Sequence, residues 1–329
     1  MSTVYVVGGR QKRDAPDSSS QWGKYEAGLV LLVDGQSGEV GQCLEYVSPP
    51  EVCPPESPST VFKAGTVDGG RLYVPTTTEV LVYALPGFEG QRYVSAPCFN
   101  DVQHVLPVDD GAELLVANTG LDMVVAVDEA GNTTREWSVT EESTWSRFSR
   151  DVDYRRVAST KPHLSHPNFV FQLEDDLWAT RCNQFDAVCL TGEHDPIRVA
   201  DGLIHDGVVR GDSVYFTVVS GEVVIVDAGT RQVRRRVDLS RLDGATPSPG
   251  WCRGIEVLDE EHIIVGFSRL RPTRWRQNVR WVKHRLGGSG AGLAPTRIAM
   301  FDLKRERLCW EVDLEPAGMN AVFSVHLQA

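Results

Sequence analysis

Short apolar runs recur in groups of four along this chain, and residues typical of turns separate them. The runs are rich in Val, Ile, Leu and Tyr, and patterns with a helical period are nearly absent. This alternation is typical of β-strands. Successive groups begin about forty residues or more apart, near Val61, Asp101, His166, Ile204 and Cys252. A repeat of this length built from four strands predicts an all-β fold in which one four-stranded unit is used several times.

The two ends of the chain supply one more unit. The C-terminal segment NAVFSVHLQA reads as one strand, and the N-terminal segments TVYVV, GLVLLVD and GQCLEYV read as three. Pairing them closes the array, which removes the exposed sheet edges that an open array would leave. The sequence therefore predicts a six-bladed β-propeller that forms a single domain over residues 1–329. Seven blades remain the alternative if one unit has been miscounted.

Two insertions interrupt the repeat. Residues 140–165 are rich in arginine and lead into His163 and His166. Residues 269–296 carry seven basic side chains and no acidic one before a GGSGAG segment, whose composition is typical of a flexible hinge. A solvated arm is one interpretation of this charged run. The other is a lid or dimer arm that offers cations to an anionic substrate.

Composition limits the classes of function. The formal net charge is −12 and the pI is about 5.2, which argues against a protein that coats nucleic acid. No secretory signal or run of membrane-spanning length is found, so we expect a cytoplasmic protein without a membrane partner. The seven cysteines are scattered and include no CxxC pair, which favours free thiols in a reducing compartment. The P-loop, Rossmann, HExxH and GxSxG motifs are absent.

A polar position recurs at the start of the first strand of each unit. In a propeller this strand lines the central channel, so side chains at its start surround the channel mouth. Aligning the units on their first turns gives a set of unlike residues: Phe62, His104, Asn168, His205 and Arg253. Such asymmetry is expected of a specific site and not of a repeated structural bond.

Histidines dominate this predicted mouth. His104, His166, His205 and His326 all fall on or next to inner strands. Neutral imidazole is the commonest ligand of transition metals in proteins, so these four residues are the predicted metal ligands. A set of His with few carboxylates favours iron, or alternatively zinc or copper, over calcium or magnesium. A polar site without metal and an inert plug of hydrogen-bonded side chains are the alternatives.

The remaining polar residues can be given roles on this hypothesis. The predicted catalytic residues are His104, His205, Asp206 and Arg253, with Asp206 orienting the neighbouring imidazole and Arg253 clamping an anion. The predicted substrate contacts are Asn118, Asn168, Arg181, Cys252 and Arg269. They describe an enzyme that acts on a small, possibly anionic molecule by oxygenase, lyase or isomerase chemistry, possibly in specialised metabolism. A propeller that binds a ligand or a protein without turnover is the alternative.

Three phrases carry a family resemblance: FNDVQH at Phe99–His104, ANTGLD at Ala117–Asp122, and WCRG followed by VGFSR at Trp251–Arg269. They resemble an uncharacterised bacterial propeller family. The repeat as a whole resembles the six-bladed propellers of the gluconolactonase, strictosidine synthase and NHL-repeat type. This resemblance implies a bacterial protein and adds a lactonase-like hydrolase as a second alternative function. Gluconolactonase-like enzymes bind a divalent cation through acidic and amide side chains, which the matching blade starts here largely lack.

Overall fold

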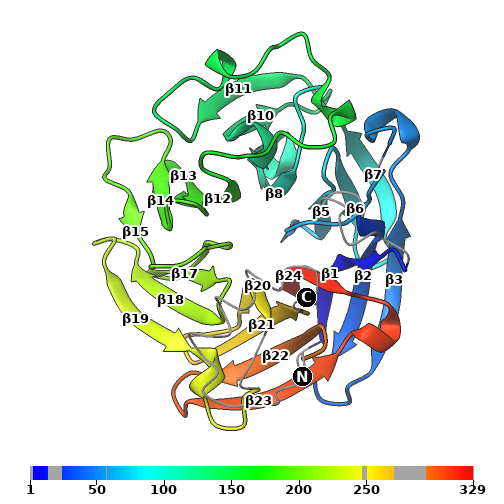
Figure 1. Ribbon diagram of the computed structural model, residues 1–329. Coiled ribbons are helices and arrows are strands. Elements are labelled where there is room, and N and C mark those ends of the chain that lie inside the picture. The colour runs from blue at the N-terminus through cyan, green and yellow to red at the C-terminus, as the bar shows by residue number, and fades with distance from the viewer. Residues whose placement is uncertain (1–2, 14–23, 57, 247–249, 270–293, 329) are drawn as a thin grey trace.

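The chain forms a ring of six four-stranded antiparallel sheets (Figure 1). The computed structural model describes residues 3–13, 24–56, 58–246, 250–269 and 294–328. The predicted all-β class and the count of six blades are both confirmed. We number the blades from 1 to 6 in chain order, beginning with the blade that contains both chain ends. No helix in these ranges is long and apolar enough to cross a membrane.

Blade 1 closes the ring as the sequence predicts, because strands from both termini pair in it. The C-terminal strand lies innermost and pairs with the first strand of the chain in a register that places His326 opposite Tyr5. Asp34 and Gly35 then begin the turn between the two outer strands. In sheet order the strands are β24 (Ala321–Leu327), β1 (Thr3–Gln11), β2 (Tyr25–Asp34) and β3 (Val40–Tyr46).

Blades 2, 3 and 4 each run in chain order from the axis outward. Blade 2 contains β4 (Thr66–Asp68), β5 (Arg71–Pro75), β6 (Val80–Ala84) and β7 (Glu89–Val94). Blade 3 contains β8 (Val102–Val108), β9 (Glu113–Asn118), β10 (Met123–Val127) and β11 (Thr133–Ser138). Blade 4 contains β12 (Pro167–Leu173), β13 (Asp176–Arg181), β14 (Asp186–Cys189) and β15 (Ile197–Arg198).

Blades 5 and 6 follow the same order. Blade 5 contains β16 (Val208–Arg210), β17 (Ser213–Val218), β18 (Glu222–Asp227) and β19 (Val233–Asp238). Blade 6 contains β20 (Trp251–Val257), β21 (His262–Ser268), β22 (Arg297–Asp302) and β23 (Arg307–Asp313).

One strand boundary in blade 2 differs from the sequence prediction. The first strand of blade 2 was expected from Val61, but β4 begins at Thr66, and the preceding segment touches β8 through a single bridge between Ala64 and His104. The basic insertion at 269–296 lies mostly outside the described residues. The insertion at 140–165 is described and carries two 3-10 turns, η5 (Thr144–Ser146) and η6 (Tyr154–Arg156).

The core lies between neighbouring sheets. Alternate residues of each strand face the adjacent blade and pack into clusters such as the one that joins Tyr73, Phe99, Leu114 and Met123 of blades 2 and 3. Removing this apolar area from water stabilises each blade contact. The first strands touch one another around the axis, and their starting ends all open on the same side. The packing therefore gathers residues from every blade at one mouth.

Candidate functional site

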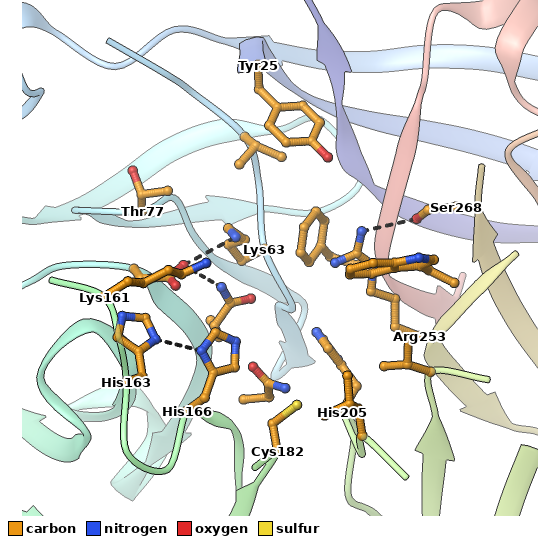
Figure 2. A pocket seen from close by; sticks show the side chains of 18 of the residues that line it. Tyr25, Lys63, Thr77, Lys161, His163, His166, Cys182, His205, Arg253 and Ser268 are labelled. Carbon is orange, nitrogen blue, oxygen red and sulfur yellow. Dashed lines mark hydrogen bonds and ion pairs between the residues drawn. The ribbon is translucent and has the colours of Figure 1, made fainter. Parts of the chain in front are cut away.

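A pocket of about 280 Å³ occupies this mouth (Figure 2). Its lining comes from segments that begin or precede the first strands, from the segments that follow the second strands of several blades, and from the end of the 140–165 insertion. Four lining side chains are cationic, namely Lys63, Lys161, Arg253 and Arg269, and a single one, Asp101, is a carboxylate. The described part of the pocket wall is therefore positively charged, although the whole chain is acidic.

Asp101, His163 and His166 converge on one side of this pocket. One ligand-type atom from each of the three lies within 4.8 Å of the other two. The Nδ1 atoms of the two imidazoles are only 2.6 Å apart, and the rings are stacked with their centroids 4.9 Å apart. Figure 2 shows the two rings side by side with their nitrogens turned toward each other. Burial lowers the pKa of both histidines, so they are neutral near pH 7.

The hydrogen bonds of His163 determine which of its nitrogens carries the proton. The Thr160 hydroxyl donates to the carbonyl oxygen of Gly120 at 2.5 Å, so it accepts from Nε2–H of His163 at 3.3 Å. A neutral imidazole has one N–H, which leaves the lone pair on Nδ1. This lone pair accepts a hydrogen bond from Nδ1–H of His166 at 2.6 Å. A hydrogen bond that fixes the distal nitrogen is also the usual support of a metal-ligating histidine.

Asp101 faces the same cluster from the start of β8. The Nε2 amide of Gln103 donates to its Oδ1 at 2.5 Å, and Nζ of Lys63 lies 3.5 Å from the same oxygen. The described residues show no contact of this kind to Oδ2. Burial lowers the pKa of Lys63 to about 8, and the nearby charge of Arg253 acts in the same direction.

The 140–165 insertion brings the two histidines to the mouth, and two buried residues anchor it. The Asp122 carboxylate accepts the backbone N–H groups of Leu164, Ser165 and His166 at 2.8–3.0 Å. The Asn100 amide donates to the carbonyl oxygens of Tyr154 and Val157, each at 2.8 Å. The phrases FND and ANTGLD therefore act partly by holding this insertion in place.

His205 lines the pocket at the start of blade 5, and the carboxylate of Asp206 orients its ring. Its Nδ1 lies 3.2 Å from Oδ1 of Asp206. The other oxygen of Asp206 accepts the Gly254 N–H at 2.8 Å and the Thr217 hydroxyl. Because Nδ1 faces the carboxylate, Nε2 is the nitrogen available to a ligand. Burial lowers the pKa of His205, and the Asp206 charge opposes that shift.

Arg253 lies between two aromatic rings in the wall of the pocket. The centre of its guanidinium is 3.9 Å from the centroid of the Phe323 ring and 5.6 Å from that of the Trp251 ring. Its Nη2 donates to the Ser268 hydroxyl at 3.4 Å. Stacking restricts the guanidinium without occupying its N–H groups, which suits a group that recognises an anion.

Five of the residues predicted from sequence line the pocket: His166, Asn168, His205, Arg253 and Arg269. Asn168 donates to the Ile204 carbonyl oxygen at 3.1 Å, and its own Oδ1 is buried with no hydrogen-bond partner among the described residues. Arg269 forms an ion pair with Glu315 at 3.2 Å. Asp206 lies just beneath the wall, 1% exposed.

The other predicted histidines lie elsewhere in the channel. His104 is buried below the pocket, stacks on Phe169 with ring centroids 3.5 Å apart, and bonds through both ring nitrogens to Val170 N–H and the Thr66 hydroxyl. His326 bonds to the Ser324 hydroxyl at 2.9 Å, and burial lowers its pKa to about 4. Of the four predicted metal ligands, the structure brings only His166 into the cluster with Asp101 and His163.

Three predicted substrate contacts lie outside the described lining of the pocket. Asn118 is fully buried and bonds to the backbone of Asn100 and Cys98. Arg181 forms a bidentate pair with Asp186 at 2.7–2.8 Å. Cys252 belongs to an apolar core cluster, where burial holds its pKa well above the usual thiol value. None of the three lines the described pocket.

Sequence reasoning gave no role in the site to four residues of the pocket: Lys63, Asp101, Lys161 and His163. Lys63 directly follows Phe62, the position that the turn alignment selected, and an error of one residue reverses the side on which a strand-like side chain lies. His163 and His166 are three residues apart in KPHLSHP. That spacing was a usable signal, but the segment was assigned to an insertion.

The donor set of the cluster is compatible with a metal. Two neutral imidazoles and one carboxylate are a combination that binds zinc or non-haem iron, and they leave other coordination positions for water or substrate. The buried cluster of Asp101, His163 and His166 could therefore hold a metal ion.

Comparison with known proteins agrees on the fold. No protein-family model and no curated protein match this chain. A solved protein of unknown function from Bacteroides caccae superposes with a TM-score of 0.62 at 11% identity, over 99% of this chain and 98% of that one. An inactive variant of virginiamycin B lyase from Staphylococcus aureus with quinupristin gives 0.45 at 14% identity, over 72% and 73% of the two chains. A putative 6-phosphogluconolactonase from Bacteroides uniformis gives 0.47 at 11% identity, over 100% and 84%. The propeller fold itself is confirmed by the six four-stranded sheets of the ring.

Proposed function

We propose that this propeller is a metal-dependent enzyme that acts on a small anionic molecule at its channel mouth. The observation that carries the proposal is the cluster of Asp101, His163 and His166, which lies in the same pocket as an imidazole held by a carboxylate. The reaction class that these groups support best is an elimination or isomerisation that begins with removal of a proton from carbon next to a carbonyl or carboxylate group.

The metal-binding part of the proposal rests on the convergence of the three side chains, whose ligand atoms lie within 4.8 Å of one another. The two Nδ1 atoms are 2.6 Å apart and share a hydrogen bond. A cation held by the cluster would take the place of the proton in that bond, with both imidazoles as neutral ligands. We propose Zn²⁺ or Fe²⁺ as that ion, because both accept two imidazoles and a carboxylate. When bound, the ion would supply Lewis-acid polarisation of a substrate oxygen.

The proton-transfer part rests on His205. Its buried imidazole is neutral near pH 7 and can act as the general base through Nε2. Asp206 holds the ring and stabilises the imidazolium that forms when the proton is taken. The cationic side chains Lys63 and Arg253 lie in the same pocket and support binding of the anionic group of the substrate.

Metal titration tests the first part. The purified protein is stripped with EDTA and titrated with Zn²⁺, and with Fe²⁺ under argon, by calorimetry and elemental analysis. We expect one ion per chain with a dissociation constant below micromolar. D101N, H163A and H166A should each weaken binding at least tenfold. H194A is the matched control, because His194 is exposed and pairs with Asp176 outside the pocket.

Solvent deuterium exchange tests the second part. The metal-loaded protein is incubated in D₂O with a panel of small 2-oxo and 2-hydroxy acids. NMR follows loss of the proton on the carbon next to the carbonyl group of the oxo acids, or next to the carboxylate of the hydroxy acids. We expect exchange in at least one acid, with loss of more than a hundredfold in H205Q. Stoichiometric metal that is unaffected by all three cluster variants would overturn the assigned ligands. Absence of bound metal would overturn the metal-dependent mechanism.

A further inference from the structure

The pocket has an apolar wall as well as a charged one. Leu203 and Val219 come from blade 5, and Trp251 begins blade 6. Lys63 precedes the first strand of blade 2, which faces blade 5 across a six-bladed ring. Figure 2 shows Lys63 and Lys161 on one side of the pocket and Arg253 on another. Leu203 and Val219 therefore lie across the mouth from Lys63, whereas Arg253 lies beside Trp251 on the same strand.

Leu203 is notable because it is 43% exposed although it lines the pocket. Leu164, which lies between His163 and Ser165 in the insertion, is 49% exposed. An exposed leucine alone needs no explanation. At the rim of a pocket whose floor is charged, however, it provides a surface that an apolar group of a ligand would cover.

The charged wall of the pocket determines which chemical group the other end of the ligand carries. Four cations face one carboxylate among the lining residues, so an anion is favoured over a neutral or cationic group. The Arg253 guanidinium is stacked between Phe323 and Trp251, which fixes the plane in which its N–H groups lie. A planar guanidinium recognises carboxylate and phosphate oxygens in pairs.

The volume of the pocket limits the size of the ligand. A volume of about 280 Å³ is slightly below the roughly 300–1,000 Å³ of sites for drug-sized ligands. It suits a compact ligand with one charged end and one short apolar end.

We propose that the substrates of this site are amphiphilic organic anions, in which a carboxylate or phosphate group is held near Arg253 and Lys63 and a short apolar chain lies against Leu203, Val219 and Trp251. This inference rests on the proposed function in so far as it takes the pocket to be a small-molecule site. It does not depend on the metal or on proton transfer.

Binding of matched probes to EDTA-treated protein tests the proposal. The probes are hexanoate, acetate, 1-hexanol and hexyl phosphate, measured by calorimetry at pH 7. Burial of one methylene is worth about fourfold in affinity. We expect hexanoate to bind at least tenfold more tightly than acetate, and at least tenfold more tightly than 1-hexanol. The tighter of hexanoate and hexyl phosphate identifies the anionic group.

Substitutions in the two walls of the pocket test which wall contacts the apolar end of the probe and which contacts the anionic end. L203S should weaken hexanoate at least threefold and leave acetate unchanged. R253Q should weaken both acids at least tenfold and leave 1-hexanol unchanged. K161Q, at an exposed loop position, gives a second test of the charged wall that does not disturb the core. Thermal melting is recorded for each variant to confirm folding.

Three results would overturn the proposal: acetate binding as tightly as hexanoate, 1-hexanol binding as tightly as the acids, or none of the four probes binding at millimolar concentration. Because the protein is free of metal in these experiments, a failed metal titration leaves their outcome unchanged. The two proposals can therefore fail separately.

Discussion

The backbone N–H of His166 donates to the carboxylate of Asp122 at 2.8 Å, across 44 positions of the sequence. Asp122 is 1% exposed and also forms an ion pair with Arg147 at 2.9 Å. It thus ties the 140–165 insertion to blade 3 at the point where the insertion delivers its histidines. Asp122 itself does not line the pocket, so it acts as a positioning residue.

Replacing Asp122 with Asn should disturb both stability and the metal cluster. The amide has one acceptor oxygen where the carboxylate has two, so it cannot accept all the N–H groups that Asp122 binds. Arg147 also loses its ion-pair partner. We expect the free energy of unfolding to fall by about 2–4 kcal/mol and the metal affinity to fall at least tenfold. Denaturant titration measures the first and calorimetry the second.

D302N is the matched control for this variant. Asp302 is also 1% exposed, and it accepts the Arg305 N–H at 2.8 Å, but it is the last residue of β22, the third strand of blade 6 counted from the axis. It should lower stability without changing metal affinity. Equal loss of metal affinity in both variants would mean that Asp122 acts through general stability only.

The surroundings of Gly254 predict that a larger residue at this position lowers the stability of the protein. The φ of Gly254 is +77°, and a Cβ there would lie 2.9 Å from Cα of Ser324 on the neighbouring inner strand. Its N–H also supports Asp206, which orients His205. We expect G254A to cost about 2–4 kcal/mol in denaturant titrations, because strain and a backbone clash add.

Gly38 gives the comparison for this glycine. Its φ is +74°, but no atom lies within 4 Å of the position a Cβ would take. G38A should therefore cost only about 1 kcal/mol, from backbone strain alone. A similar cost in both variants would show that blade 6 can move away from β24.

The blade architecture was predictable because it depends on local signals. Alternating apolar runs and turns rich in Asp and Gly repeat along the sequence, and the two chain ends supply the strands of one more blade. Each of these signals follows from hydrogen bonding and burial within a few residues. The positions of His205, Arg253 and Asn168 followed from the same alignment. They lie at the starts of blades, where the direction of the first strand along the channel is the same in every blade.

The cationic residues and the cluster of Asp101, His163 and His166 were not predictable in the same way. His163 reaches the pocket through an insertion whose path is set by Asp122 and Asn100, both distant in sequence. Lys63 lies in an irregular segment before β4, where the strand alignment fails. Cys252 and Arg181 were predicted from their places near the ends of strands. The structure places Cys252 in an apolar core cluster and Arg181 in an ion pair with Asp186, and neither lines the described pocket.

Thiol reactivity provides a third prediction. Cys182 lines the pocket, but burial raises its pKa to about 12, and Cys252 is fully buried. Cys309 on β23 is exposed. Because alkylation requires the thiolate, iodoacetamide at pH 8 should modify Cys309 before the other two. Peptide mass spectrometry measures the order, and protein unfolded in guanidinium should lose it. Equally rapid labelling of Cys182 and Cys309 would indicate a pocket that opens readily.

Glu256 should make stability depend on pH near neutrality. It lies on β20, and burial raises its pKa to about 7 from an ordinary 4.5. Between these two values the folded protein keeps a proton that the unfolded chain releases. Stability therefore falls as the pH rises through this window. Because the side chain is partly exposed, we expect a contribution of about 2 kcal/mol and not the full effect of the shift.

E256Q tests this assignment, because the amide is neutral at every pH. Denaturant titrations at pH 4.5 and pH 7.5 should show that E256Q gains stability relative to the parent protein at the higher pH and not at the lower one. E260Q, in the exposed turn that follows β20, is the matched control and should show no such difference. If the stability of E256Q follows that of the parent protein at both pH values, Glu256 ionises in the folded state without penalty, and the buried end of β20 is more accessible to water than its packing indicates.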